Sequence, residues 1–252
     1  MSYQFELVLP CYNEAKSLRQ IAERTVNAAR AANFTTQTFQ LVLVENGSRD
    51  NSLAVMNEMK TDSELAPWLR IVMVPVNQGY GHGVWTGLKS CTAQWVAWSH
   101  SDQQCDPGDA FRGLNVLLQK PGEKILVKGL RHGRSLQERF VSRTFEILAW
   151  MILGRALYEI NAQPKVFSRS LMNELTAPPK DFAFDLYVLF TALQKGWRLK
   201  TMDVQFPPRV HGLSNWAHSL KSRRKTIWNM ILYMFQLRRD SQSSNPLSSS
   251  AL

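Results

Sequence analysis

The feature that most constrains the fold is an alternation of apolar, strand-like runs with helical segments through the first half of the chain. The pattern predicts strands near residues 5–10, 39–44, 70–76, 95–98 and 124–127, with helical segments between them. Strands that alternate with helices at this spacing are joined by right-handed crossovers and pair in parallel. We therefore expect an α/β fold with a Rossmann-like, mostly parallel sheet flanked by helices.

The second half of the chain changes character, because longer helices replace the regular alternation. The pattern predicts helices at 138–157 and 184–195 and a late strand at 199–206. The end of the chain is rich in serine and has little apolar surface to bury, which is typical of disorder. We expect three parts: a domain at 1–215, a basic amphipathic helix at 216–239 and a disordered tail at 240–252.

The charge balance limits the partners that this chain attracts. Its 252 residues hold 30 Lys and Arg against 20 Asp and Glu, a formal charge of +10. Such a surface favours nucleic acid, anionic lipid or phosphorylated small molecules. Nucleic acid is the weakest of these candidates, because no recognised binding motif is present and the basic residues lie beside apolar helices.

Cysteine usage and the absence of targeting signals predict a cytoplasmic location. The three cysteines show no Cys-x-x-Cys spacing, which suits a reducing compartment and argues against a disulfide framework or a thiolate zinc site. The amino terminus has no signal-peptide pattern, and no stretch reaches the roughly 18 apolar residues that a membrane span needs.

The stretch from Trp95 to Pro107 is the strongest candidate for a functional site. Its apolar start ends in a polar cluster, and Pro107 then opens a predicted helix, so the cluster is a loop at the carboxyl end of a strand. Ligands of open α/β sheets bind at that edge. Asp102 and Gln104 supply oxygen atoms for one hard cation and His100 supplies a nitrogen, although a polar turn without a ligand is the alternative.

Three further loops follow predicted strands, and each has two interpretations. The glycine-rich run 77–83 either cradles phosphate on backbone N–H groups or forms a plain turn into a helix. Residues 45–46 either hydrogen-bond a base or ribose or cap a helix. The Arg-x-x-Gly-x-Ser run at 209–214 either grips a diphosphate through its guanidinium or lies at the surface.

Taken in order, these motifs resemble those of a family-2 glycosyltransferase with the GT-A fold, in the branch of dolichol-phosphate mannose synthase and other polyprenyl-phosphate glycosyltransferases. The run 8–14 matches the family's Pro-x-Tyr-Asn-Glu start, and 44–50 stands in the place of Val-Asp-Asp-Gly-Ser-x-Asp. Residues 77–87 match its Asn-x-Gly-x-Gly helix entry. Residues 101–107 stand where the Asp-x-Asp metal motif runs on to Asp-Pro, and 209–214 match the late Arg-x-x-Gly-x-Ser.

The resemblance implies a nucleotide-diphosphate sugar donor, Mg²⁺ or Mn²⁺ as cofactor, and inversion at the anomeric carbon. By position in the motifs, the nucleotide-sugar-binding residues would be Pro10, Tyr12, Asn13, Glu14, Glu45, Asn46, Gly47, Asn77, Gly79, Gly81, Ser101 and Asp102. The metal ligands would be His100, Asp102 and Gln104. The acceptor phosphate would meet Lys128, Arg131, Arg143 and Ser214.

The chemistry of such a transfer assigns catalytic roles to Asp102, Arg209 and Asp185. A diphosphate leaves readily only when its charge is neutralised, which a cation on Asp102 together with Arg209 would achieve. A polyprenyl phosphate is already anionic and needs no strong base, whereas a hydroxyl of a glycan precursor requires a carboxylate to take its proton. Asp185, on a predicted helix, is the candidate base if the fold turns it inward, and otherwise a solvated carboxylate.

The chain leaves the family pattern at three places. His100 replaces the first metal Asp, which bears on metal affinity. Glu45-Asn46 replaces an Asp-Asp pair, which bears on the nucleotide, and 161–165 replaces a Gly-Phe stretch, which bears on the acceptor. A non-catalytic relative that binds sugar nucleotides is therefore an alternative to an active enzyme.

The final predicted helix has basic residues at 221–225 and 238–239 on either side of an apolar run at 227–235. This run is too short to span a bilayer, but basic flanks and aromatic anchors are typical of an interfacial helix. Peripheral contact with the inner face of a membrane is one interpretation. A core helix packed on the sheet, or a dimer contact, is the other.

Overall fold

A single sheet forms the centre of the protein. The computed structural model describes residues 3–207 and 220–243. In the second range, side chains are described from Thr226 onward. The described strands are β1 (Phe5–Cys11), β2 (Phe39–Asn46), β3 (Leu69–Val74), β4 (Trp95–Trp98), β5 (Ile125–His132), β6 (Lys165–Ser168) and β7 (Arg198–Gln205). The described helices are α1 (Ala15–Ala31), α2 (Ser52–Thr61), α3 (Tyr80–Ser90), α4 (Gly108–Leu118), α5 (Leu136–Leu153), α6 (Phe184–Gln194) and α7 (Leu220–Ser243), with short 3-10 turns η1 (Ala66–Trp68) and η2 (Arg169–Glu174).

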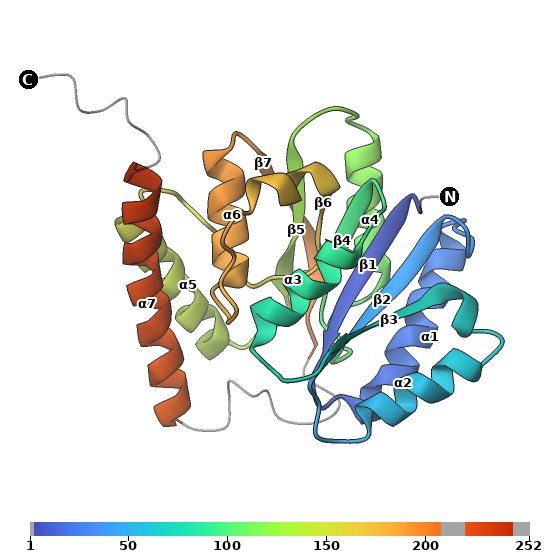
Figure 1. Ribbon diagram of the computed structural model, residues 1–252. Coiled ribbons are helices and arrows are strands. Elements are labelled where there is room, and N and C mark those ends of the chain that lie inside the picture. Colours follow the sequence, from blue (N-terminus) through green and yellow to red (C-terminus); the bar gives the residue numbers. More distant parts are fainter. Residues whose placement is uncertain (1–2, 208–219, 244–252) are drawn as a thin grey trace, which may run out of the picture.

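The sheet has seven strands in the order β3-β2-β1-β4-β6-β5-β7. All neighbouring pairs are parallel except those of β6, which runs antiparallel to both β4 and β5. The expectation of a mostly parallel α/β sheet is therefore confirmed. The β6 strand was predicted only as a short apolar piece. Its four residues lie between β4 and β5 and join the parallel strands β3-β2-β1-β4 to the parallel pair β5-β7 (Figure 1).

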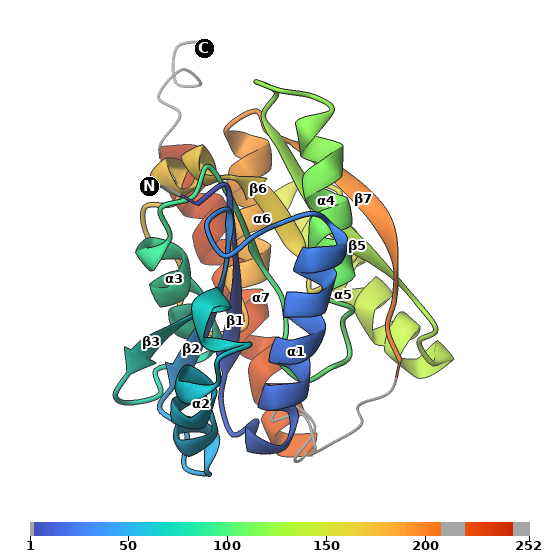
Figure 2. The ribbon, with the colours of Figure 1, turned by 90° about the vertical axis from the view of Figure 1, so that its right-hand side faces the viewer.

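Helices cover both faces of the sheet, because alternate residues of the central strands point to opposite sides. Leu7 and Leu9 of β1 belong to a buried cluster that includes residues of α1, α2 and α4, whereas Val8 belongs to a second cluster that includes residues of α3, α5, α6 and α7. Figure 2 shows α1 and α4 in front of the sheet and α6 and α7 behind it. The loops that follow β1, β2 and β4 are left at one edge, where the sequence places its polar motifs.

The α5 helix is shorter than the predicted 138–157 at one end and longer at the other. It begins after Ser135, whose hydroxyl accepts the N–H of Glu138 while the Glu138 carboxylate accepts the N–H of Ser135. It ends at Gly154, which adopts a left-handed conformation at φ 65°. A capping box and a glycine cap are strong helix boundaries, and they override the apolar pattern that continues to Leu157.

Two other boundaries differ from the prediction by more than two residues. The β5 strand extends to His132 rather than Val127, because it pairs with β7 over its whole length. The α7 helix ends at Ser243, so residues 240–243 of the predicted tail are helical. The predicted start of that helix, at Trp216, lies outside the described residues. Among the helices that the structure describes, none has both the length and the apolar content needed to cross a membrane.

Candidate functional site

The loops after β1 and β2 are joined by hydrogen bonds between short polar groups. The Asn13 N–H donates to Ser48 Oγ over 3.2 Å, and the Arg49 N–H donates to Asn13 Oδ1 over 2.8 Å. The Glu14 N–H donates to Ser52 Oγ over 3.0 Å. The predicted donor-binding residues of the two loops, with half-buried Pro10 and Tyr12 beside them, therefore lie together at the sheet edge. The groups in these three contacts are neutral or backbone, and the Asp50 carboxylate adds a fourth contact by accepting the Ala15 N–H over 3.1 Å.

The Glu45 carboxylate closes its own turn. It is buried and accepts the N–H groups of Gly47 and Ser48, over 3.1 and 2.6 Å. Gly47 has a φ of +69°, and a Cβ there would lie 2.4 Å from the backbone nitrogen of Asn77, so only glycine fits. This arrangement supports the structural interpretation of Glu45 over a direct contact with a base or ribose.

Asn46 and Asn77 connect the β2 loop to the glycine-rich turn. Asn77 Nδ2 donates to the Asn46 carbonyl over 2.9 Å, and Asn46 Nδ2 donates to the Gly79 carbonyl over 3.1 Å. Asn46 Oδ1 is buried and accepts no hydrogen bond from the described residues. A buried acceptor without a partner is costly, so this oxygen is suited to accept a donor group from a ligand or a water molecule.

The glycine-rich turn is explained by a close backbone approach. A Cβ on Gly79 would lie 2.3 Å from the Lys180 carbonyl oxygen, and one on Gly81 would lie 2.4 Å from that of Pro179. The His82 N–H donates to Lys180 O over 2.9 Å, and the Gly79 N–H is taken by the Asn77 side chain. The plain-turn interpretation therefore accounts for these glycines, and two of the N–H groups of the supposed phosphate cradle already have partners.

All three predicted metal ligands lie on the loop that follows β4. Ser101 Oγ donates to the Pro10 carbonyl over 2.9 Å, which fixes the loop beside β1. Asp102 is buried, and its Oδ1 accepts the Gln104 N–H over 3.1 Å. The Gln104 amide nitrogen donates to the Pro207 carbonyl over 3.0 Å, which directs the amide group toward the end of the segment after β7.

His100 lies half-buried on the same loop, with its ring centroid 6.0 Å from that of Tyr80. Burial lowers the pKa of the imidazole below its ordinary value, although the charge of Asp102 acts in the opposite direction. The neutral form that a metal ligand requires is therefore favoured.

The three candidate metal ligands suit a cation whose remaining ligands come from a bound diphosphate. No group of three or more His, Cys, Asp or Glu side chains within residues 3–207 and 220–243 could hold a metal by itself. The loop offers one carboxylate (Asp102), one amide oxygen (Gln104) and one imidazole (His100). Mg²⁺ usually takes one or two carboxylates and completes its shell with substrate phosphates and water, which is compatible with this set.

Asp185 points inward, into a buried cluster below the loops. It lies in the first turn of α6, is 2% exposed, and accepts a hydrogen bond from Gln163 Nε2 over 2.9 Å. It also forms an ion pair with Lys165, which is fully buried and donates to the Ala162 carbonyl over 3.1 Å. Burial lowers the pKa of Lys165, and the Asp185 carboxylate opposes that shift. The fold turns Asp185 inward, which was the condition for its candidacy as the base, but a carboxylate in such a pair is poorly placed to take a proton.

Lys128 is not placed to meet an acceptor. Its side chain is 1% exposed, and its ammonium donates to the carbonyls of Tyr158 and Gly129 over 2.8 and 3.2 Å. Burial lowers the pKa of Lys128 to about 7. The predicted contact with an acceptor phosphate is therefore corrected: Lys128 ties β5 to the segment after α5.

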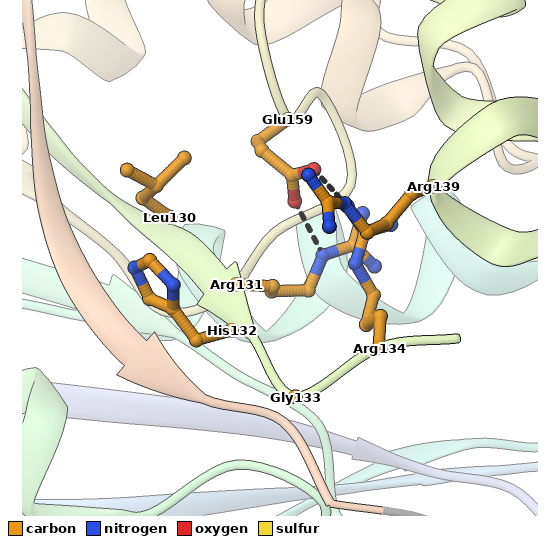
Figure 3. A pocket seen from close by; sticks show the side chains of 7 residues that line it. All are labelled: Leu130, Arg131, His132, Gly133, Arg134, Arg139 and Glu159. Carbon is orange, nitrogen blue, oxygen red and sulfur yellow. Dashed lines mark hydrogen bonds and ion pairs between the residues drawn. The ribbon is translucent and has the colours of Figure 1, made fainter. Parts of the chain in front are cut away.

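A cavity of about 280 Å³ lies between the end of β5 and the start of α5 (Figure 3). Arg131, Arg134 and Arg139 surround it, with Glu159 between the first two. Arg131 Nε donates to Glu159 Oε2 over 2.7 Å, and Arg134 pairs with the other carboxylate oxygen. Arg134 Nε is buried and has no hydrogen-bond partner among the described residues. We call this cavity the arginine pocket.

Of the residues that line the arginine pocket, two arginines and one carboxylate were not predicted as site residues: Arg134, Arg139 and Glu159. The signal for Arg134 was the Arg-His-Gly-Arg-Ser run at 131–135, which links a strand end to a helix start, and Arg139 follows four residues later in α5. Glu159 has no such signal, because its position depends on a distant contact. Its N–H donates to Glu146 Oε1 over 2.7 Å, which holds Glu159 at a φ of +47°.

Two of the other predicted acceptor residues, Lys128 and Arg143, do not line the arginine pocket. Arg143 lies one helical turn further along α5, is exposed, and contacts Glu146 at 3.2 Å and the Tyr158 ring at 5.4 Å. Arg209 and Ser214, predicted to bind diphosphate and acceptor, lie outside the described residues. Of the four predicted acceptor residues, Arg131 is the one that the described structure places in the pocket.

A mostly parallel sheet with polar loops at its carboxyl edge and a cationic pocket beside them is the arrangement of a sugar-nucleotide-dependent transferase of the GT-A type. The sequence profile described as glycosyl transferase family 2 matches residues 6–183, well over half of the chain. The chain belongs to that family.

Two relatives show how far the similarity extends. An undecaprenyl-phosphate 4-deoxy-4-formamido-L-arabinose transferase of Sodalis glossinidius is 27% identical over 171 residues, which make up 67% of this chain and 50% of that protein. An uncharacterized glycosyltransferase of Mycobacterium tuberculosis is 27% identical over 219 residues, 85% of this chain and 90% of the relative. The chain thus spans half the length of the first protein and nearly all of the second.

The fold is shared with glucosyl-3-phosphoglycerate synthase of Mycobacterium tuberculosis. The complex of that enzyme with Mn²⁺, uridine diphosphate and glucosyl-3-phosphoglycerate has a TM-score of 0.67 at 16% identity, covering 94% of this chain and 80% of that one. Its complex with phosphoglyceric acid gives the same TM-score at 17% identity, covering 93% and 80%. The GT-A fold is therefore confirmed.

Proposed function

We propose that this protein transfers a sugar from a nucleotide-diphosphate donor to a polyprenyl phosphate, with inversion at the anomeric carbon and with Mg²⁺ or Mn²⁺. The observation that carries the proposal is the arginine pocket, which offers guanidinium groups at the same edge of the sheet as the predicted donor loops. Guanidinium pairs are suited to phosphate recognition. The relative from Sodalis, which acts on undecaprenyl phosphate by name, supports the choice of acceptor.

The residues of the β4 loop would hold the cation. Asp102 would supply a carboxylate, Gln104 an amide oxygen and His100 a neutral nitrogen, with the donor diphosphate completing the shell. When bound, the cation would neutralise the departing diphosphate. The metal- and uridine-diphosphate-bound complexes of the synthase with the same fold support this part of the proposal. The open acceptor on Asn46 would bind a donor group of the nucleotide.

A phosphate acceptor also agrees with the pairing of Asp185. A phosphate oxygen is anionic and attacks without a general base, so the reaction makes no demand on a carboxylate that is already bonded to Lys165. A hydroxyl acceptor would need Asp185 to leave that pair before it could take a proton. The arrangement therefore favours the phosphate acceptor of the two candidates.

The test has two stages. The first is a thermal-shift screen of sugar nucleotides with Mn²⁺, because a specific ligand raises the melting temperature by mass action. The second offers the selected donor to a short-chain polyprenyl phosphate and to the matching polyprenol. Transfer to the phosphate and none to the alcohol is expected. Donor binding without turnover would favour the non-catalytic alternative, and transfer to a glycan hydroxyl would overturn the proposed acceptor.

A further inference from the structure

The α5 helix exposes an apolar stripe along its whole length. Leu136, Phe140, Ile147, Trp150 and Met151 are all exposed, with Phe140 at 73% and Trp150 at 58%. Their spacing of three, four or seven residues places them on one side of the helix. Apolar groups of this size rarely stay in water together unless a partner or a bilayer covers them.

The α7 helix has a second stripe of the same kind. Trp228, Leu232 and Phe235 follow one another at four and three residues and are each at least half exposed, with Trp228 at 61%. On its opposite side, Met230 and Met234 are buried against the core. One apolar side of α7 therefore packs against the core, and the other apolar side is exposed to solvent.

The two helices pack against each other. They lie side by side at the left of Figure 1, and Arg238 of α7 donates from its guanidinium to the Ile152 carbonyl of α5 over 2.7 Å. Ile152 and Leu153 join Met234 in the same buried cluster as the sheet. We call the two exposed stripes together the α5–α7 face.

Exposed basic side chains accompany the α5–α7 face. Arg139, Arg143 and Arg155 are exposed on or just after α5, and Arg239 is exposed on α7. The described part of these two helices has only two exposed carboxylates, Glu138 and Asp240, because Glu146 is buried. Aromatic and aliphatic groups among basic residues match an anionic bilayer surface. A second copy of the chain would oppose arginine with arginine across a two-fold axis, which is unfavourable.

We propose that α5 and α7 together dock this protein on an anionic lipid bilayer, with the apolar stripes in the interface and the arginines among the headgroups. Arg139 belongs both to this face and to the arginine pocket, so the pocket opens where the apolar stripe of α5 begins. A lipid phosphate could enter the pocket while its chain stays in the bilayer beside Phe140. This last step rests on the proposed function, whereas docking itself needs no turnover.

The experiment is co-sedimentation with vesicles of phosphatidylcholine, with and without about 30 mol% phosphatidylglycerol. The variants are Phe140→Ser, Trp228→Ser and the double variant, all at exposed positions. The matched control is Leu118→Ser, an exposed leucine at the end of α4 on the other side of the sheet. The wild type and the control should bind the anionic vesicles. The double variant should lose about ten-fold or more in affinity, and each single variant less.

Salt and oligomeric state complete the test. Raising the salt from about 0.1 to about 0.5 M should weaken binding to anionic vesicles, because the arginines are screened. Equal recovery of the wild type and the double variant would overturn the proposal. So would light scattering that shows a dimer which the double variant breaks, together with no vesicle binding. Vesicle binding without transfer to polyprenyl phosphate would support the docking face and refute the proposed function.

Discussion

The loops that we propose to bind the donor (the donor side) and the arginine pocket that we propose to bind the acceptor (the acceptor side) lie at the same edge of the sheet but are held by different interactions. Around β1, β2 and β4, backbone N–H groups and short polar side chains bind each other, as Asn13 does with Ser48 and Arg49. Around β5 and α6, buried charges bind each other, as in the pairs of Glu159 with two arginines and of Asp185 with Lys165. The donor side is therefore preorganised by many weak bonds, whereas the acceptor side depends on a few strong ones.

This difference predicts how each side responds to substitution. A typical hydrogen bond contributes about 1 kcal/mol, so single changes among the donor loops should affect ligands more than folding. Removing one partner of a buried ion pair costs about 3–5 kcal/mol, because the other charge stays buried. The acceptor side should therefore lose stability first.

The largest effect on the donor side should come from Asp102→Asn. If Asp102 is the carboxylate of the metal site, its loss should lower transfer about a thousand-fold, equivalent to about 4 kcal/mol of barrier. The melting temperature should stay close to that of the wild type. Asp109→Asn, in the first turn of α4, is the control, since that carboxylate pairs with Arg112 at 3.0 Å and is not one of the predicted metal ligands. Near-normal turnover of the Asp102 variant would remove the metal-site assignment.

On the acceptor side, Asp185→Asn should lower the free energy of unfolding by about 3 kcal/mol, because Lys165 would remain buried without its partner. Urea denaturation at neutral pH measures this change. The double variant Asp185→Asn with Lys165→Met should recover much of the loss, since it removes the uncompensated charge. A single variant as stable as the wild type but inactive would instead identify Asp185 as the proton acceptor.

Lys128 should make stability depend on pH. Burial lowers its pKa to about 7 in the folded protein, whereas in the unfolded chain it keeps its proton up to about pH 10.5. Between these values the unfolded state binds more protons, so stability rises with pH. The wild type should gain about 2 kcal/mol relative to Lys128→Met between about pH 7 and 9. The control Lys124→Met, at an exposed ammonium, should leave the pH profile unchanged.

Glu159→Gln should make the arginine pocket more attractive to anions. The carboxylate occupies Arg131 and Arg134, and without it their charges are open to a phosphate. Inorganic phosphate should bind the variant about five-fold more tightly than the wild type, equivalent to about 1 kcal/mol. Calorimetric titration measures this, and Glu174→Gln, at a carboxylate paired only with Lys124 near the surface, is the control. Weaker phosphate binding to the Glu159 variant would show that the carboxylate organises the arginines for the anion.

The smallest effect should be that of His100→Asp, which restores the family's metal residue on the donor side. A second carboxylate should favour a hard cation, so Mg²⁺ affinity should rise about three-fold and the preference for Mn²⁺ should fall. Metal titrations in the presence of nucleotide diphosphate compare the two proteins. Identical metal profiles would place His100 outside the coordination shell.

The donor side was largely predictable because its residues follow strands directly in sequence. Ser101, Asp102 and Asn46 needed only the positions of the strand ends, and parallel strands bring those ends to one edge. The glycine-rich turn could not be interpreted without the structure. The sequence shows the glycines, but it does not show that the 179–181 segment lies against them.

The acceptor side resisted prediction because its partners are distant in sequence. Lys165 and Asp185 lie 20 positions apart in the chain, and Arg131 and Glu159 lie 28 apart. The burial of Lys128 was hidden for another reason. Residues 125–129 of β5 are buried on both faces, so alternation does not separate inward from outward positions there.

The contact between Gly79 and Lys180 has a mechanical consequence. With a Cβ excluded at 2.3 Å and the backbone bonded at His82, the turn before α3 and the segment before α6 cannot slide past one another. The turn also touches Asn46 and Asn77, and the segment leads directly into the helix that carries Asp185. A displacement of the turn must therefore also displace the first residues of α6. The position of Asp185 in the buried charge cluster is thus coupled to the donor loops through direct contacts, with no domain movement required.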